Sequence, residues 1–331
     1  MHKLEYLWLD GCTPTQIRYK TKVVRDFGKA VDGVPVWGFD GSSTEQADGG
    51  SSDCVLKPVR VYNNPIERDS SIVLCEVWNV DDTPHETNTR RMLEETLEDL
   101  ESDIDEWVGF EQEYTLYDNK TAKPYGWPDI GEPPPQGDYY CGRNVGENIM
   151  KKHMNACIQA GIHICGTNAE VMLGQWEYQI GAGSSIAMSD DLWVARWLME
   201  RICDHYDLSV SLHPKPIAGD WNGAGCHTNF STAEMREEGG YPAIIEACHK
   251  LSENPQKHID AYGVDNEQRL TGEYETCSID EFRFGVSDRG ASIRIPWQVK
   301  KDGWGYLEDR RPSSNCDPYI VAKTLVDTIC N

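Results

Sequence analysis

The sequence predicts an α+β fold, with a small β-rich N-terminal domain over residues 1–82 and a larger α+β domain over residues 83–331. Three observations support this prediction. The chain has 331 residues, which is longer than the roughly 250–300 residues at which a single hydrophobic core stops growing. Its first eighty residues form strand-like runs between turn residues, and clear helical periodicity begins only after residue 87.

Four strands are predicted in the N-terminal part, over residues 3–9, 17–24, 55–62 and 72–78, because Gly, Pro, Asn and Asp turns separate them. A polar, Gly/Ser-rich segment, FDGSSTEQADGGSSDC, runs from Phe39 to Cys54 and is predicted to be a loop. Irregular loops of this length inside compact domains are uncommon and often functional.

The first helix is predicted over residues 87–103, with Thr87 as its N-cap. Leu93, Leu97, Leu100 and Ile104 recur at helical spacing, and the acidic opposite face is expected to be solvated. Further strands are expected near residues 108–116, 164–180 and 207–213. Further helices are expected near residues 146–160, 188–205, 242–252 and 317–329, with a Pro-rich loop at 131–140.

Composition excludes several classes of function. The chain has 31 basic and 55 acidic residues, so its net charge is 31 − 55 = −24, which argues against binding to nucleic acid or to an anionic membrane surface. No apolar run approaches the roughly 18 residues of a membrane span. The start, MHKLEYLWLD, has no cleavable apolar segment, so we expect a cytoplasmic protein.

Twelve cysteines without a C-x-x-C pair are expected to be reduced and mostly buried.

Two carboxylates fall on one face of the strand WVGFEQEYTLY. Alternation places Glu111 and Glu113 on one side and Phe110, Gln112 and Tyr114 on the other. Neighbouring carboxylates on an otherwise apolar strand repel each other and lose hydration, and a divalent cation relieves both effects. The alternative is that this is the solvated face of an edge strand.

A second acidic pair occurs in GTNAEVMLGQWEYQIG. A straight strand would place Glu170 and Glu177 on opposite faces, because they are seven residues apart, but Gly174 can supply a bend that returns them to one side. Two acids in each of two strands indicate a metal site more strongly than either pair alone.

The segment GDWNGAGCHTNFS is Gly-rich and contains His227, and its glycines permit close approach of the backbone to a ligand. A single histidine is more often structural than a ligand, but here it accompanies four glutamates. An oxygen-rich site with one imidazole suits Mg²⁺ or Mn²⁺ rather than Zn²⁺.

Arginines gather toward the C-terminus, at Arg269, Arg289, Arg294, Arg310 and Arg311. Their guanidinium groups suit carboxylate and phosphate ligands, although each could instead pair with a surface acid. Acids, Mg²⁺ and arginines together are the components of phosphoryl transfer. The sequence contains no G-x-x-x-x-G-K-[ST] and no G-x-G-x-x-G after a strand. These residues alone indicate a Mg²⁺-dependent ligase or kinase for an acidic small molecule.

Several blocks together resemble the glutamine synthetase family, in its short eukaryote-like type II form. They are FDGSSTEQADGGSSD, GFEQEYTLYD, PQGDYYCG, GTNAEVMLGQWEYQIG, KPIAGDWNGAGCHTNFST, RLTGEYET, DRGASIRIP and GYLEDRRPSSNCDPY, in the family's order. The resemblance implies an N-terminal β-grasp domain and a catalytic domain with a curved antiparallel sheet. It also implies that ATP, L-glutamate and ammonia give L-glutamine, ADP and phosphate through γ-glutamyl phosphate.

The resemblance also implies two or three Mg²⁺ or Mn²⁺ ions per site, with ATP as a substrate. One ligand set matches Glu113, Glu170 and Glu177, and a second, beside the ATP phosphates, matches Glu111, His227 and Glu308.

Other positions match the family's substrate contacts. Those for glutamate are Arg269, Arg310, Asn222 and Gly223, and those for ATP are Asn229, Ser231, Tyr306, Arg289 and Arg294, with Arg289 also counted as catalytic. Glu275 matches the acid on a flap over the substrate. Asp40 and Asp53 match the pair that binds ammonium and takes its proton.

In the resembled family the N-terminal domain of one subunit completes the active site of the next, so we expect a ring-forming homo-oligomer, a decamer in that family. The chain departs from the family pattern in a shorter segment at 141–154, in Ala182–Ser184, and in Gln268 where an arginine is common. Two alternatives remain open: a related γ-glutamyl ligase that uses another amine, and a non-catalytic scaffold of the same fold.

Overall fold

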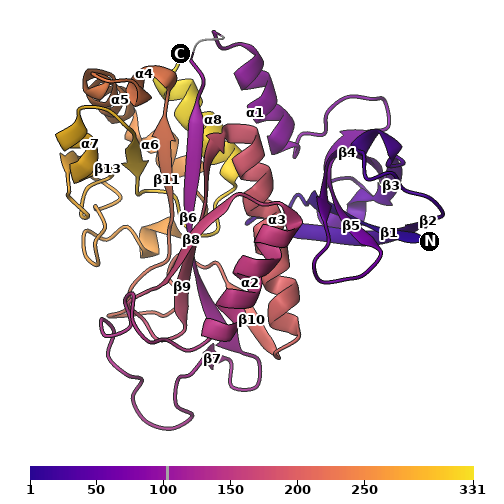
Figure 1. Cartoon of the computed structure of the whole chain (residues 1–331), viewed down its shortest axis with the longest axis horizontal. Coiled ribbons are helices and arrows are strands. Elements are labelled where there is room, and N and C mark those ends of the chain that lie inside the picture. Colours follow the sequence, from indigo (N-terminus) through magenta and orange to yellow (C-terminus); the bar gives the residue numbers. More distant parts are fainter. Residues whose placement is uncertain (102–103) are drawn as a thin grey trace.

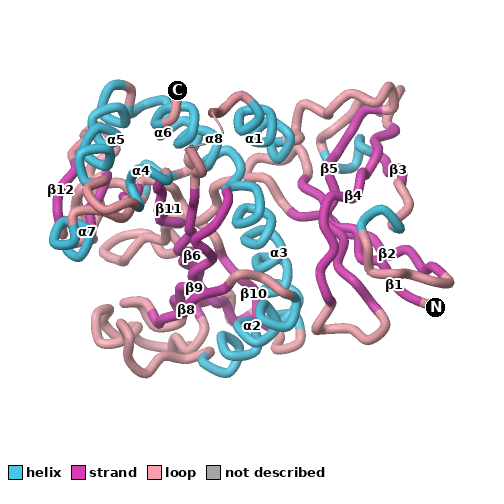
Figure 2. The backbone as a smooth tube through the Cα atoms, turned by 45° about the horizontal axis from the view of Figure 1, so that its top comes forward, coloured by secondary structure: helices cyan, strands magenta, loops and turns pink. Residues whose placement is uncertain are grey.

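A computed structural model describes residues 1–101 and 104–331. Two β-sheets lie on either side of one long helix, α3 (Ser185–Asp204), as Figures 1 and 2 show. The N-terminal sheet, in indigo, is on one side, and the larger sheet carries the candidate site on the other. The structure is α+β, in agreement with the predicted fold class.

The N-terminal sheet has five strands in the order β2-β1-β5-β4-β3. The strands are β1 (His2–Leu9), β2 (Ile17–Val24), β3 (Trp37–Asp40), β4 (Asp53–Asn63) and β5 (Ser70–Asn79). The β1–β5 pair is parallel, and the other pairs are antiparallel. Alternation along β1 directs Leu4 and Tyr6 into a small core of this sheet, whereas Leu7 and Leu9 join the main core. The sheet is therefore packed against the rest of the chain.

The larger sheet has nine strands. Its main path is β12-β13-β14-β11-β6-β9-β8, and β7 and β10 also pair with β6. The strands are β6 (Trp107–Asp118), β7 (Lys123–Pro124), β8 (Ile164–Ala169), β9 (Gln175–Ser184), β10 (Leu208–Ser211), β11 (Cys226–Ser231), β12 (Phe284–Val286), β13 (Ile293–Ile295) and β14 (Leu307–Asp309). All pairs are antiparallel except β12–β13, so the expected antiparallel sheet has one parallel pair at its edge.

Helices cover one face of the larger sheet. Besides α3, the helices of the described residues are α1 (Thr89–Glu98), α2 (Glu147–Ala160), α4 (Ala233–Arg236), α5 (Tyr241–Glu253), α6 (Pro255–Ala261), α7 (Trp297–Asp302) and α8 (Pro318–Ile329), with short 3₁₀ turns at Val31–Gly33, Gly41–Thr44 and Asn266–Gln268. From α3, the buried Arg196 donates to Gln112 Oε1 of β6 at 2.8 Å and to the carbonyl of Cys316 at 2.8 Å. Gln112 thus faces the helices, which leaves its neighbours Glu111 and Glu113 on the opposite face.

The predicted helix at 87–103 is wrong at both ends. Asn88 rather than Thr87 is the N-cap, because its side chain accepts from the Arg91 N–H at 3.1 Å. The Thr87 hydroxyl instead accepts from Gln46 at 2.7 Å. The helix ends at Glu98, and the predicted residues 102–103 lie outside the described part.

The predicted loop 39–54 is shorter than expected. β3 extends to Asp40, a 3₁₀ turn follows at Gly41–Thr44, and β4 begins at Asp53, so irregular chain is confined to residues 45–52. His227, which was expected in a Gly-rich loop, lies on β11, because pairing with β6 begins one residue earlier, at Cys226.

The cysteine prediction is confirmed: all twelve are free and most are buried. None of the helices in the described ranges has the length and apolar character needed to cross a membrane.

Candidate functional site

One cavity of about 590 Å³ opens on the face of the larger sheet that the helices leave uncovered. Many of the residues singled out in the sequence line it: Glu111, Glu113, Glu170, Glu177, Asn222, Gly223, His227, Arg269, Glu275, Arg289, Arg294, Glu308 and Arg310. They come from strands β6, β9, β11, β13 and β14 and from the segments between strands and helices. The sheet thus brings together residues that are up to 310 − 111 = 199 positions apart.

Strand register places the acids together. Glu113 lies directly opposite Glu177 in the β6–β9 pair, and Glu111 lies opposite His227 in the β6–β11 pair. Gly174, at φ +87°, forms the turn between β8 and β9 that brings Glu170 to the same side. The bend predicted at Gly174 is therefore a tight turn between two paired strands.

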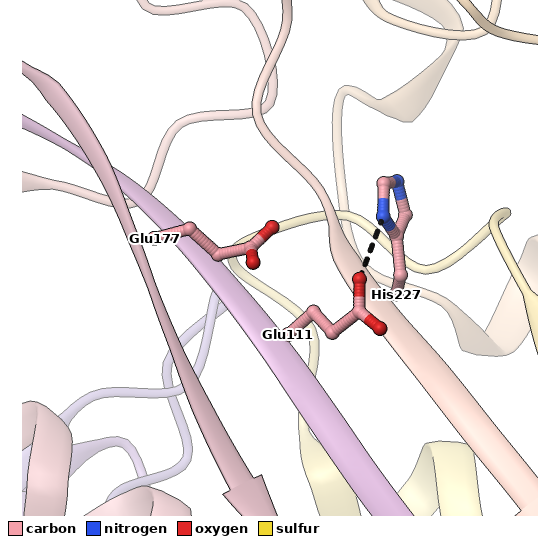
Figure 3. A group of neighbouring side chains, drawn as sticks. All are labelled: Glu111, Glu177 and His227. Carbon is pink, nitrogen blue, oxygen red and sulfur yellow. Dashed lines mark ion pairs between the residues drawn. The ribbon is translucent and has the colours of Figure 1, made fainter. Parts of the chain in front are cut away.

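Two groups of potential metal ligands result. Glu113, Glu170 and Glu177 form one group, and Glu111, Glu177 and His227 form the other, with ligand atoms within 4.8 Å of one another in each. Figure 3 shows the second group, with His227 Nδ1 3.7 Å from Glu111 Oε2. Glu177 belongs to both groups, so it can bridge two ions.

Burial makes the acidic groups costly as anions. It raises the pKa of Glu170 to about 8, with a further contribution from the charge of Glu113. It also raises the pKa of Glu177 well above its ordinary value, and the charges of Glu111 and Glu113 add to the effect. Burial raises the pKa of Glu113 as well, despite the opposing charge of Arg269. A hard divalent cation would offset this repulsion, and a carboxylate-rich donor set fits such an ion.

His227 is held neutral in the same environment. Burial lowers its pKa well below the ordinary value, and the positive charge of Arg310 adds to this effect. Arg269 Nη2 lies 3.0 Å from His227 Nε2, so Nδ1 is the nitrogen that faces the carboxylates. A neutral imidazole is the form that binds metal ions.

Polar neighbours orient the carboxylates. Asn168 donates to Glu170 Oε1 at 2.8 Å, and Asn229 donates to Glu111 Oε1 at 2.9 Å. Gln179 donates to Glu177, and the backbone N–H of Gly225 donates to Glu113. Such outer contacts fix the positions of metal ligands.

Glu308 differs from its expected grouping with Glu111 and His227. Arg310 Nη1 lies 2.6 Å from Glu308 Oε1, and Arg294 pairs with the other oxygen. Glu308 Oε1 is still 3.6 Å from His227 Nδ1. The carboxylate is therefore next to the metal-ligand group but already neutralised by two guanidinium groups.

Arginines line the same cavity as the acids. Arg269 is fully buried, and burial lowers its pKa to about 10; it donates to the Arg310 carbonyl at 2.9 Å. Arg310 in turn donates to the carbonyls of Arg289 at 3.0 Å and Glu275 at 3.3 Å. Acids and cations thus line one cavity side by side, an arrangement suited to an anionic substrate beside metal ions.

Five of the site residues that the family resemblance implies do not line this cavity. Asp40 and Asp53 are exposed and lie opposite each other on β3 and β4. Figure 1 shows these two strands on the far side of α3 from the larger sheet. Hydrogen bonds from the side chain and backbone of Ser42, at 2.7 and 3.0 Å, lower the pKa of Asp40. The other residues, Asn229, Ser231 and Tyr306, lie on or beside β11 and β14.

The cavity also contains residues that the sequence analysis did not single out: Gln136, Gly137, Tyr140, Asn168, Val171, Tyr274 and Thr276. Gln136 Oε1 accepts from the backbone N–H of Asn222 at 2.8 Å, which joins the Pro-rich loop to the Gly-rich loop. In the sequence, Gln136 was marked only by its place in the block PQGDYYCG, which resembles the family.

A family model and curated relatives agree on one family, and a solved structure shares the fold. A model of the glutamine synthetase catalytic domain matches residues 86–260. A glutamine synthetase from Streptomyces viridochromogenes is 51% identical over 99% of this chain and 97% of its own length. One from Xenopus laevis is 48% identical, covering 98% of this chain and 85% of the relative. A solved structure of the Plasmodium falciparum glutamine synthetase is 15% identical and has a TM-score of 0.81, covering 99% of this chain and 71% of that one.

Proposed function

The chain belongs to the glutamine synthetase family, whose reaction is the ATP-dependent ligation of ammonia to L-glutamate, and we propose that the acid- and arginine-lined cavity is where it makes glutamine. The single observation that carries this assignment is the meeting of two carboxylate groups with Arg269 and Arg310 in one cavity.

Chemistry explains why both kinds of residue are needed. A carboxylate is a poor electrophile, so one of its oxygens must first become a leaving group. The γ-carboxylate oxygen of glutamate attacks the γ-phosphorus of ATP and ADP departs, which gives γ-glutamyl phosphate. Ammonia then attacks the acyl carbon, and phosphate leaves with the oxygen that it received. Arg269 and Arg310, with Asn222 and Gly223, hold the glutamate, because guanidinium groups pair with carboxylates.

The family uses divalent metal and ATP, and the acidic groups fit hard cations. We assign two or three Mg²⁺ or Mn²⁺ ions to the set Glu111, Glu113, Glu170, Glu177, His227 and Glu308. The chemistry that such ions supply when bound is neutralisation of phosphate oxygens during phosphoryl transfer. On the protein side, Arg289 and Arg294 hold the phosphates of ATP, and Asn229, Ser231 and Tyr306 contact the nucleoside.

Ammonium needs a separate site, because it has no lone pair until it loses a proton. Asp40 and Asp53 form a carboxylate pair that can attract the cation and accept that proton. Both belong to the N-terminal domain, residues 1–82, and lie away from the cavity of their own chain. They would therefore reach the cavity of the catalytic domain, residues 83–331, in a neighbouring subunit of a ring-shaped homo-oligomer in the cytoplasm.

A coupled assay of ADP release tests the proposal. Purified protein with Mg²⁺ and ATP should release ADP steadily only when glutamate and ammonium are both present, with glutamine formed in equal amount. Methylamine and other primary amines, offered at the same free-base concentration, should be poorer substrates, because the carboxylate pair selects a small cation. Faster turnover with a larger amine would assign the chain to another γ-glutamyl ligation, and no nucleotide turnover would indicate a scaffold.

A further inference from the structure

A hydrogen bond joins two loops at the mouth of the cavity. Tyr274 Oη donates to Asp220 Oδ1, and the two residues are 54 positions apart in the chain. Tyr274 belongs to the flap that carries Glu275, and Asp220 precedes the cavity residues Asn222 and Gly223. The contact therefore connects the flap to the loop assigned to glutamate binding.

The flap is a loop closed at its base by a bridge between Thr271 and Ser278. Tyr274 and Glu275 both have positive φ, 52° and 60°, a backbone conformation that is unfavourable for residues other than glycine. Thr276 Oγ1 donates to the carbonyl of Glu273 at 2.8 Å and to that of Arg269 at 3.2 Å. This backbone conformation needs contacts that hold it, and the Tyr274–Asp220 hydrogen bond is one of them.

Lys215 supports the same contact. Its Nζ lies 4.7 Å from the centre of the Tyr274 ring and donates to the carbonyl of Trp221, next to Asp220. The tyrosine ring is thus held between an ammonium group on its face and a carboxylate at its hydroxyl. On the inner side of the flap, the Glu275 carbonyl accepts from Arg310 Nη2 at 3.3 Å.

We propose that Tyr274 and Asp220 are positioning residues that latch the flap over the cavity and so keep water from the acyl phosphate. The inference rests on the proposed function, which it deepens. With the latch open, water instead of ammonia adds to the acyl carbon of γ-glutamyl phosphate. The bond between the acyl carbon and the bridging phosphate oxygen then breaks. Glutamate and phosphate are then released, so the net reaction is hydrolysis of ATP.

The decisive measurement is the ratio of phosphate released to glutamine formed at saturating substrates. Tyr274→Phe keeps the ring and its contact with Lys215 but removes the hydrogen bond. We expect the ratio to rise from about one in the unaltered protein to about two or more in the variant. Asp220→Ala should give the same rise, and the double variant should show no further increase. Asp220→Asn keeps an acceptor oxygen, so its ratio of phosphate to glutamine should stay close to one.

The matched control is Tyr19→Phe, because Tyr19 is an exposed tyrosine on β2 of the N-terminal sheet and does not line the cavity. This variant should keep a ratio of about one, and all variants should melt within about 2 °C of the unaltered protein, as surface changes usually do. A merely structural role for Tyr274 would lower melting temperature and activity together and leave the ratio unchanged, which would overturn the proposal.

Hydrogen exchange of the flap separates this inference from the proposed function. In the ligand-free protein, amides of residues 272–277 should exchange several-fold faster in Tyr274→Phe than in Tyr19→Phe. If the unaltered protein forms no glutamine, the proposed function is wrong, and unchanged flap exchange would then also refute the latch. If it forms glutamine and both readouts are unchanged in Tyr274→Phe, only the latch is refuted.

Discussion

Replacing Glu177 by glutamine should abolish glutamine formation and, in the absence of metal, stabilise the protein. Glu177 belongs to both groups of potential metal ligands, so its loss removes one ligand from each. We expect activity to fall at least about a thousandfold, or about 4 kcal/mol of transition-state stabilisation. The fold should persist, because glutamine keeps an oxygen that can accept the hydrogen bond from Gln179.

The stability gain should depend on pH. Burial raises the pKa of Glu177 well above its ordinary value in the folded chain. The folded state therefore holds the proton more tightly than the unfolded state, and ionisation costs stability as pH rises above about 4.3, the unfolded value. Glutamine removes this cost. In EDTA, the melting temperature of Glu177→Gln should exceed that of the unaltered protein by a margin that grows from pH 5.5 to pH 8.

With metal present, the unaltered protein should melt at a higher temperature than Glu177→Gln, the reverse of the order in EDTA. Millimolar Mg²⁺ or Mn²⁺ should raise the melting temperature of the unaltered protein, most strongly at high pH, and raise that of Glu177→Gln much less. Glu253→Gln, an exposed change at the end of α5, is the matched control and should behave like the unaltered protein. Equal metal-induced shifts in Glu177→Gln and the unaltered protein would contradict the assigned ligand set.

Two inactive variants should restore each other when mixed. Asp40→Asn keeps the N-cap of the turn Gly41–Thr44, because asparagine caps as well as aspartate does. It removes the proposed proton acceptor and should cost about a hundredfold in glutamine formation. Glu177→Gln has an intact Asp40 loop but an impaired cavity. In a ring, the loop of one subunit can meet the cavity of the other.

After dissociation and reassembly of an equal mixture, about a quarter of the sites should combine an intact loop with an intact cavity, if subunits mix at random in a closed ring. Activity should rise to about that fraction of the unaltered rate. The control is the double variant Asp40→Asn/Glu177→Gln, which supplies neither part and should rescue neither single variant. Reassembled oligomers, verified by light scattering, that stay inactive would show that the loop does not serve a neighbour.

Local pattern was sufficient to predict the acidic face of the site. Alternation from Phe110 to Tyr114 assigns Glu111 and Glu113 to one side, and the strand has that orientation because Phe110 and Tyr114 pack into the core. Gly174 was identified as the bend because the seven-residue spacing of Glu170 and Glu177 requires one, and its φ of +87° is a conformation that glycine adopts at low cost. Cross-strand register then brought Glu177 opposite Glu113, which no local pattern specified.

Contacts between residues far apart in the chain determine several features that the sequence could not predict. Thr87 and Asn88 are both good N-caps, and the choice depended on a hydrogen bond from Gln46, 41 residues away. Glu308 has two arginine partners. Arg294 lies opposite it in the β13–β14 pair, and Arg310 is two residues further along the chain. The contact between Asp220 and Tyr274 likewise joins loops that are unrelated in sequence.

In the proposed reaction, the γ-carboxylate of glutamate becomes an acyl phosphate in the cavity, and ammonia attacks this intermediate. The most direct test uses glutamate labelled with ¹⁸O in its γ-carboxylate, with ATP, Mg²⁺ and ammonium, and mass spectrometry of the released phosphate. One ¹⁸O atom is expected in the phosphate for each glutamine formed, because the activated oxygen leaves with phosphorus. Glutamine formed together with unlabelled phosphate would contradict it.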